Sequence, residues 1–130
     1  NNRASFVLQL FAIAVGGAVG AIMRFAMSNG VYKLFGRDFP YGTLAVNVLG
    51  SLLIGVLFIL LIEKLAVAAE WRAGLLVGLL GAFTTFSTFS LETFTLMENG
   101  AFIKAGLNVF LSVVLCLAAT WLGISLGRQL

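Results

Sequence analysis

The chain has 130 residues, of which 61% are hydrophobic and only 10% are charged, and its mean hydropathy is +1.09. A soluble domain carries roughly 25% charged residues, and a core of this size is too small to hide so much apolar surface from water. An ordinary soluble domain is therefore excluded. The net charge of +3 is not gathered into the basic stripe that a nucleic-acid partner would need.

The positions of the charged residues predict four transmembrane helices. The pairs Arg3/Arg24, Asp38/Glu63, Arg72/Glu92 and Lys104/Arg128 enclose 20, 24, 19 and 23 uncharged residues. A helix that rises 1.5 Å per residue needs about 20 apolar residues to cross roughly 30 Å of hydrocarbon. Each uncharged segment is therefore long enough to span a lipid bilayer once.

In chain order, the first helix is predicted to end near Asn29-Gly30. The second is predicted to begin near Pro40, because proline is tolerated in a first turn, and Trp71 suits the membrane interface at the start of the third. The predicted helices cover about residues 6–28, 40–63, 71–98 and 102–127. Because the connections are short, we expect one domain over residues 1–130, with antiparallel consecutive helices. Glycines four apart, as at Gly16/Gly20 and Gly123/Gly127, favour close helix packing.

The basic residues give almost no preferred orientation in the membrane. With four spans, both termini share a side with the connection between the second and third helices. That side has four basic residues and the other side has three, or four if Arg24 ends the first helix. Orientation normally follows an excess of Lys and Arg on the cytoplasmic side. We expect the chain to insert both ways and to form an antiparallel homodimer; one orientation fixed by other features is the alternative.

The third helix contains an unusual polar stretch, Gly81-Ala82-Phe83-Thr84-Thr85-Phe86-Ser87-Thr88-Phe89-Ser90. Threonine forms helix poorly, and Ser and Thr can bond back to the backbone. Either the helix is interrupted here, or it stays straight with its hydroxyls bonded internally. An interruption at membrane depth requires burial in protein or a wet cavity, and its free carbonyls suit a small cation.

Other polar residues lie on the second and fourth helices. An amide in hydrocarbon needs partners, so Asn47 is either a contact between helices or a donor to a passing anion. Asn108, Ser112 and Cys116 are four apart and share one face, which indicates either packing contacts or a polar track.

The uncharged segments hold no acid or base, and the chain has no histidine and one cysteine. We therefore expect no catalytic site. Neutral donors and the positive edges of phenyl rings suit a small anion better than a cation.

Three motifs resemble the Fluc (CrcB) family of fluoride channels over essentially the whole chain. They are Gly16-Gly17-x-x-Gly20-x-x-x-Arg24, Gly42-Thr43-Leu44-x-x-Asn47-x-x-Gly50 and Gly81-x-x-Thr84-Thr85-Phe86-Ser87-Thr88-Phe89-Ser90-x-Glu92. The third motif is long and specific. The chain departs from the family at Ala82, where many members have a second glycine, and at Asn108 and Cys116, where tyrosine or serine is frequent.

The resemblance implies a dual-topology antiparallel homodimer with two fluoride pathways and a break in the third helix. By position, the implied pathway residues are Asn47, Phe86, Phe89, Asn108, Ser112 and Cys116, with Arg24 near the aqueous entrance. A structural sodium ion at the dimer interface would be held by carbonyls of Gly81 and Thr84 from each subunit. The implied activity is passive fluoride export, without enzymatic chemistry, across the inner (plasma) membrane of a bacterium.

Two alternatives remain open. A small multidrug-resistance-type transporter has a similar length and four helices, but such proteins use a carboxylate in the first helix, and residues 1–28 contain none. A membrane assembly subunit without transport activity would not require a polar track.

Overall fold

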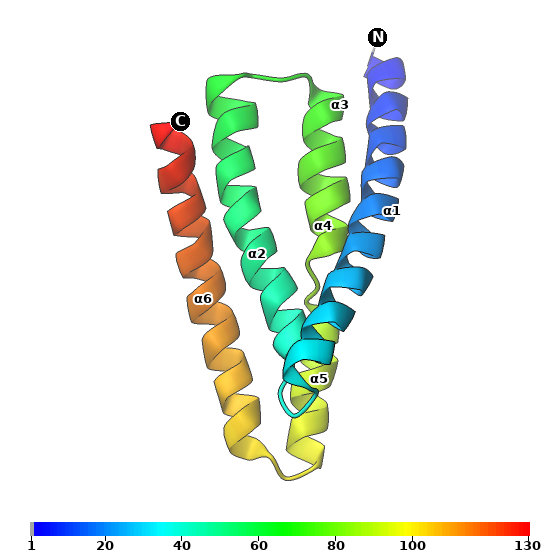
Figure 1. Ribbon diagram of the computed structural model, residues 1–130. Coiled ribbons are helices and arrows are strands. Elements are labelled where there is room, and N and C mark those ends of the chain that lie inside the picture. The colour runs from blue at the N-terminus through cyan, green and yellow to red at the C-terminus, as the bar shows by residue number, and fades with distance from the viewer. Residues whose placement is uncertain (1) are drawn as a thin grey trace.

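The computed structural model describes residues 2–130 as a bundle of long helices joined by short connections (Figure 1). The elements are α1 (Asn2–Phe35), α2 (Tyr41–Phe58), the π-helix η1 (Ile59–Lys64), α3 (Ala69–Arg72), the π-helix η2 (Ala73–Leu79), α4 (Leu80–Phe83), α5 (Ser87–Glu98) and α6 (Phe102–Gln129). Four segments are long and apolar enough to cross a membrane, namely Asn2–Phe35, Tyr41–Lys64, Ala69–Glu98 and Phe102–Gln129. The predicted all-helical fold with four spans is confirmed.

Both termini and the connection between η1 and α3 lie at one end of the bundle, opposite the α1–α2 and α5–α6 connections (Figure 1). α1 packs against η2 and α4, and α2 packs against α6. Many large apolar side chains, such as Phe11, Ile22 and Trp121, are exposed. Such surfaces are stable in hydrocarbon, where packing rather than the hydrophobic effect holds helices together.

Glycines allow the backbones of these helix pairs to touch. A Cβ atom at Gly16 would overlap the carbonyl oxygen of Gly74, and one at Gly20 would overlap that of Leu79. On the other side of the bundle, a Cβ atom at Gly123 would overlap the carbonyl oxygen of Leu52. The spacing of small residues therefore sets the α1–η2 and α2–α6 contacts.

The predicted end of the first helix near Asn29-Gly30 is wrong, because α1 continues to Phe35. Glycine inside a helix costs only about 1 kcal/mol, and the extra turn buries Tyr32, whose hydroxyl donates to Glu92 Oε2 at 2.7 Å. The helix ends at Gly36, which has φ +82° and whose N–H donates to the Tyr32 carbonyl. A glycine in this left-handed conformation is a common helix terminator.

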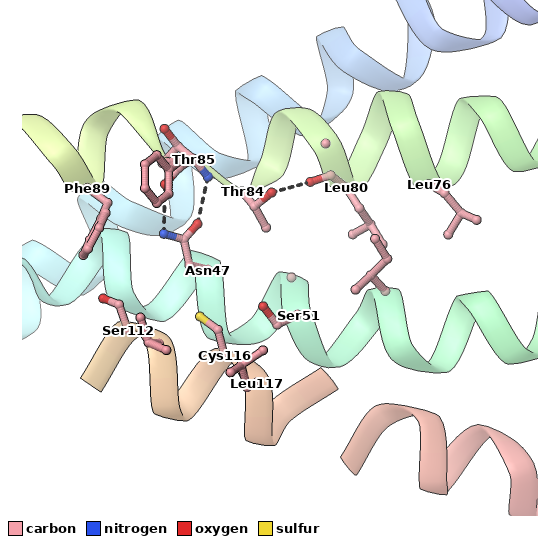
Figure 2. A pocket seen from close by; sticks show the side chains of 15 residues that line it. Asn47, Ser51, Leu76, Leu80, Thr84, Thr85, Phe89, Ser112, Cys116 and Leu117 are labelled. Carbon is pink, nitrogen blue, oxygen red and sulfur yellow. Dashed lines mark hydrogen bonds between the residues drawn. The ribbon is translucent and has the colours of Figure 1, made fainter. Parts of the chain in front are cut away.

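The third span is interrupted at residues 84–86, which are not helical. α4 ends at Phe83, Thr84 has extended backbone angles of φ −90° and ψ 159°, and α5 begins at Ser87. This connection lies beside the middle of α2 and supplies several residues of the cavity described next (Figure 2).

Candidate functional site

A cavity of about 470 Å³ lies between α2, α4, α5 and α6 (Figure 2). Seven residues that the sequence indicated line it together: Asn47, Gly81, Thr84, Phe86, Phe89, Ser112 and Cys116. They come from three of the four spans, so only the folded chain brings them to one place.

The polar groups that line this cavity are all uncharged. Its 15 lining residues include no Asp, Glu, Lys or Arg. The hydroxyl of Ser112 is buried and has no hydrogen-bond partner within the chain, so no protein acceptor competes for its O–H. Cys116 lies one turn further along α6, and its thiol is a weaker donor. A cavity with neutral donors can replace the water of an anion without holding that anion as tightly as a fixed cation would.

Asn47 binds both backbone groups of Thr85. Its Nδ2 donates to the Thr85 carbonyl at 2.9 Å, and its Oδ1 accepts from the Thr85 N–H at 2.8 Å. Figure 2 shows these two bonds side by side. Because irregular backbone inside a membrane must be satisfied by protein groups, this side chain makes the non-helical conformation of residues 84–86 tolerable.

Around residues 84–86, two backbone N–H groups donate to side chains instead of to the backbone carbonyls that they would reach in a continuous helix. In a continuous helix, the Thr85 N–H would donate to the Gly81 carbonyl, but it donates to Asn47 instead. The Thr88 N–H would donate to the Thr84 carbonyl, but it donates to the Thr85 hydroxyl at 3.3 Å. The carbonyls of Gly81 and Thr84 therefore lose their helical donors, and carbonyl oxygens so released are suitable ligands for a small cation.

Arg24 also acts on this part of the chain. Its Nε donates to the Ala82 carbonyl at 2.9 Å, in place of the N–H of residue 86, which would be the helical donor. A cation at the carbonyl end of a helix is electrostatically favourable. Among residues 2–130, Arg24 and Asn108 are the two predicted pathway residues that do not line the cavity.

Phe86 and Phe89 lie at one side of the cavity, with ring centroids 5.3 Å apart and ring planes inclined by 49°. Phe89 is half-buried, whereas Phe86 is 77% exposed. A residue that lines a cavity and is still largely exposed must lie at its rim. The cavity is therefore open beside Phe86 in the single chain.

Three residues that were not among the predicted site residues form hydrogen bonds with residues of the predicted motifs or of the predicted polar track. Thr85 bonds to Asn47, Thr93 accepts from Asn108 Nδ2 at 2.8 Å, and Tyr32 donates to Glu92. Thr85 belongs to the polar stretch that the sequence singled out. The pairing of Tyr32 with a residue sixty positions away has no signal in a single sequence.

Four apolar spans, an interrupted third span and a neutral polar cavity define a multi-pass helical membrane protein with a ligand cavity inside its bundle. Residues 11–124 match the family described as CrcB-like protein, Camphor Resistance (CrcB). The chain belongs to this family.

Curated relatives cover nearly the whole chain. A protein of Methylococcus capsulatus named fluoride-specific ion channel FluC is 63% identical over 123 residues, which are 95% of this chain and 54% of that protein. Proteins of the same name from Geobacter sulfurreducens and Coxiella burnetii are 54% and 50% identical; the matches cover 93% and 95% of this chain, and 98% and 100% of those proteins. The chain thus spans about half of the Methylococcus relative and almost all of the other two.

Proposed function

We propose that this chain is a fluoride-selective passive ion channel. The observation that supports this most directly is the neutral polar cavity, in which the buried Ser112 hydroxyl has no partner, within a chain closely similar to proteins named fluoride-specific ion channels. A channel of this kind moves an ion down its gradient and carries out no covalent chemistry.

The chemistry of the cavity fits a small, strongly hydrated anion. An amide nitrogen has two N–H donors, and Asn47 uses one on the Thr85 carbonyl, so the second can serve the ion. The edges of Phe86 and Phe89 carry the positive part of the ring quadrupole. The hydroxyl of Ser112 and the thiol of Cys116 continue the donors along α6, whereas Asn108, one turn before them, donates to Thr93. Arg24 adds a positive charge near this region, which favours anions.

The functional unit is an antiparallel homodimer of dual topology with two fluoride pathways. The exposure of Phe86 at the open rim supports this assembly, because a second copy would cover the ring and close the cavity. The basic residues support the opposite orientation of the two copies. Because α1 continues past Arg24, this residue lies within a span, and the count of basic residues at the two ends is four against three.

A structural sodium ion fits the carbonyls of Gly81 and Thr84. Gly81 is exposed, and the helical donors of both carbonyls are bonded to side chains instead. Two copies meeting at this segment would offer four such oxygens. When bound, the ion would offset the partial negative charges of the carbonyl oxygens and hold the two chains together. We place the dimer in the inner membrane of a bacterium, where passive efflux would protect the cytoplasm from fluoride.

The test is fluoride release from liposomes that contain the purified protein. We expect release much faster than from empty liposomes, with chloride retained. Phe86→Ile and Phe89→Ile remove the ring edges, and each should slow fluoride release by at least roughly tenfold, the effect of about 1.4 kcal/mol, while the dimer persists in size-exclusion chromatography. Release no faster than from empty liposomes would contradict a channel, and equal chloride release would contradict selectivity.

A further inference from the structure

α5 is held in the bundle by very little apolar packing. None of its twelve residues is buried, although it carries Phe89 and begins directly after Phe86. Its neighbours are α6 and, more weakly, α2. Polar contacts with neighbouring helices can therefore take a large share in placing and rotating this helix.

Two hydrogen bonds between helices meet α5 at consecutive residues. Glu92 Oε2 accepts from the Tyr32 hydroxyl of α1 at 2.7 Å, and Thr93 Oγ1 accepts from Asn108 Nδ2 of α6 at 2.8 Å. Consecutive residues of an α-helix point about 100° apart around its axis. Two bonds in directions so different, to two different helices, resist both the displacement and the rotation of α5.

The residues that donate these bonds are buried and have further contacts of their own. Asn108 is 1% exposed and Tyr32 is 9% exposed. The Tyr32 hydroxyl also lies 3.4 Å from Thr43 Oγ1, and the guanidinium of Arg37 stands 4.4 Å from the centre of its ring. Bonds from buried and fixed donors constrain a neighbouring helix more than bonds from mobile side chains would, because little side-chain entropy is lost in making them.

The bond from Asn108 reaches the backbone of the turn that carries Phe89. The Thr93 hydroxyl, which accepts from Asn108, donates in turn to the Phe89 carbonyl at 2.8 Å. A continuous chain of hydrogen bonds thus joins α6 to the residue whose ring lines the cavity.

We infer that Tyr32 and Asn108 are positioning residues that set the rotation of α5 and, through it, the direction in which Phe86 and Phe89 present their rings to the cavity. This inference rests on the proposed function for its effect on ion flux, but not for its effect on α5 itself. It gives Asn108 a different role from direct contact with the ion, since its amide is engaged with Thr93 and it does not line the cavity.

The chain offers a matched pair of substitutions for the test. Thr93 and Thr95 both donate to a carbonyl one turn earlier, at 2.8 and 2.9 Å, but only Thr93 is shown accepting a bond from another helix. Thr93→Val should accelerate amide hydrogen exchange in α5 several-fold and slow fluoride release by roughly tenfold, the range of one interhelical hydrogen bond. Thr95→Val should leave both close to the values of the unmodified protein, and Thr93→Ser should restore them.

Tyr32→Phe removes only the hydroxyl at the other contact and should also accelerate exchange in α5. This variant gives the same test if Thr93→Val fails to assemble. Equal exchange in Thr93→Val and Thr95→Val would overturn the inference, and so would faster exchange with unchanged fluoride release. If the unmodified protein releases no fluoride, the proposed function fails, whereas the exchange comparison in lipid nanodiscs still decides whether these bonds hold α5.

Discussion

The side chain of Asn47 takes over hydrogen bonds that a continuous helix would make with its own backbone. It satisfies the N–H and the carbonyl of Thr85, and by doing so it leaves the Gly81 carbonyl without its helical donor. A primary amide can donate and accept in parallel in this way without being charged or protonated. The conformation of residues 84–86 and the proposed sodium ligands therefore depend on one residue of α2.

We predict that Asn47→Leu destabilises the chain by about 1–3 kcal/mol, because two hydrogen bonds inside the membrane are lost. Asn47→Asp keeps the acceptor for the Thr85 N–H but loses the donor, and it places a negative charge in the anion cavity. It should therefore abolish fluoride release even if stability is partly kept. Thermal unfolding in detergent and liposome flux measure the two effects. Ser51→Ala, one turn further along α2 in the same cavity, is the control, and an equal loss of stability there would contradict the prediction.

Gly50 is needed for a different reason, namely space beside Thr84. A Cβ atom at this position would overlap Thr84 Cγ2, and Thr84 is held by its hydroxyl, which donates to the Leu80 carbonyl at 3.0 Å. Gly50→Ala should therefore displace Thr84 and weaken the proposed sodium site, so that the dimer dissociates at a higher sodium concentration than in the unmodified protein. Gly106→Ala has open space around it and should leave dissociation unchanged. If dissociation of both variants depended on sodium in the same way, Thr84 would not be part of a sodium site at the dimer interface.

At the scale of helices, the sequence was sufficient for the spans but not for their ends. The uncharged segments predicted all four spans, because hydrocarbon thickness imposes a length that charges reveal. The continuation of α1 past Gly30 could not be predicted, because it depends on the contact between Tyr32 and Glu92, which are far apart in sequence. For the site, residue type and spacing indicated Asn47, Ser112 and the phenylalanines. They did not indicate that Arg24 bonds to Ala82 or that Asn108 bonds to Thr93, since these pairs are set by tertiary packing.

Because only part of α1 packs against η2, we predict that glycine-to-alanine substitutions at two positions of α1 change the stability in opposite directions. Gly20→Ala would force a Cβ atom into the Leu79 carbonyl and separate two backbones, so we expect a loss of about 2 kcal/mol or more. Gly30→Ala meets nothing within 4 Å and should gain up to about 1 kcal/mol from helix propensity. Thermal unfolding of both variants in one detergent gives the comparison. A loss at both positions would mean that alanine is unfavourable in α1 for some reason other than contact with η2.

At the scale of the whole molecule, the near balance of basic residues is the observation on which the proposed dual topology depends. Four basic residues at the end that holds the termini face three at the other end. The orientation rule acts through small differences in the number of Lys and Arg residues near the ends of spans. We therefore expect two added lysines at one end to bias insertion, and this gives a test of the proposed antiparallel dimer that does not require a structure of the dimer.

We predict that Ala68→Lys/Gln129→Lys, at the end that holds the termini, leaves most copies in one orientation and abolishes most fluoride release. Leu34→Lys/Asn99→Lys, at exposed positions of the opposite end, should do the same with the reverse orientation. Each variant alone lacks an antiparallel partner, whereas the two expressed together supply one for each other. Co-expression should therefore restore both the dimer and fluoride flux, as measured by resistance of fluoride-sensitive cells and by liposome release. Full activity of either variant alone, with its single orientation verified by cysteine labelling from one side, would show that a parallel arrangement is sufficient.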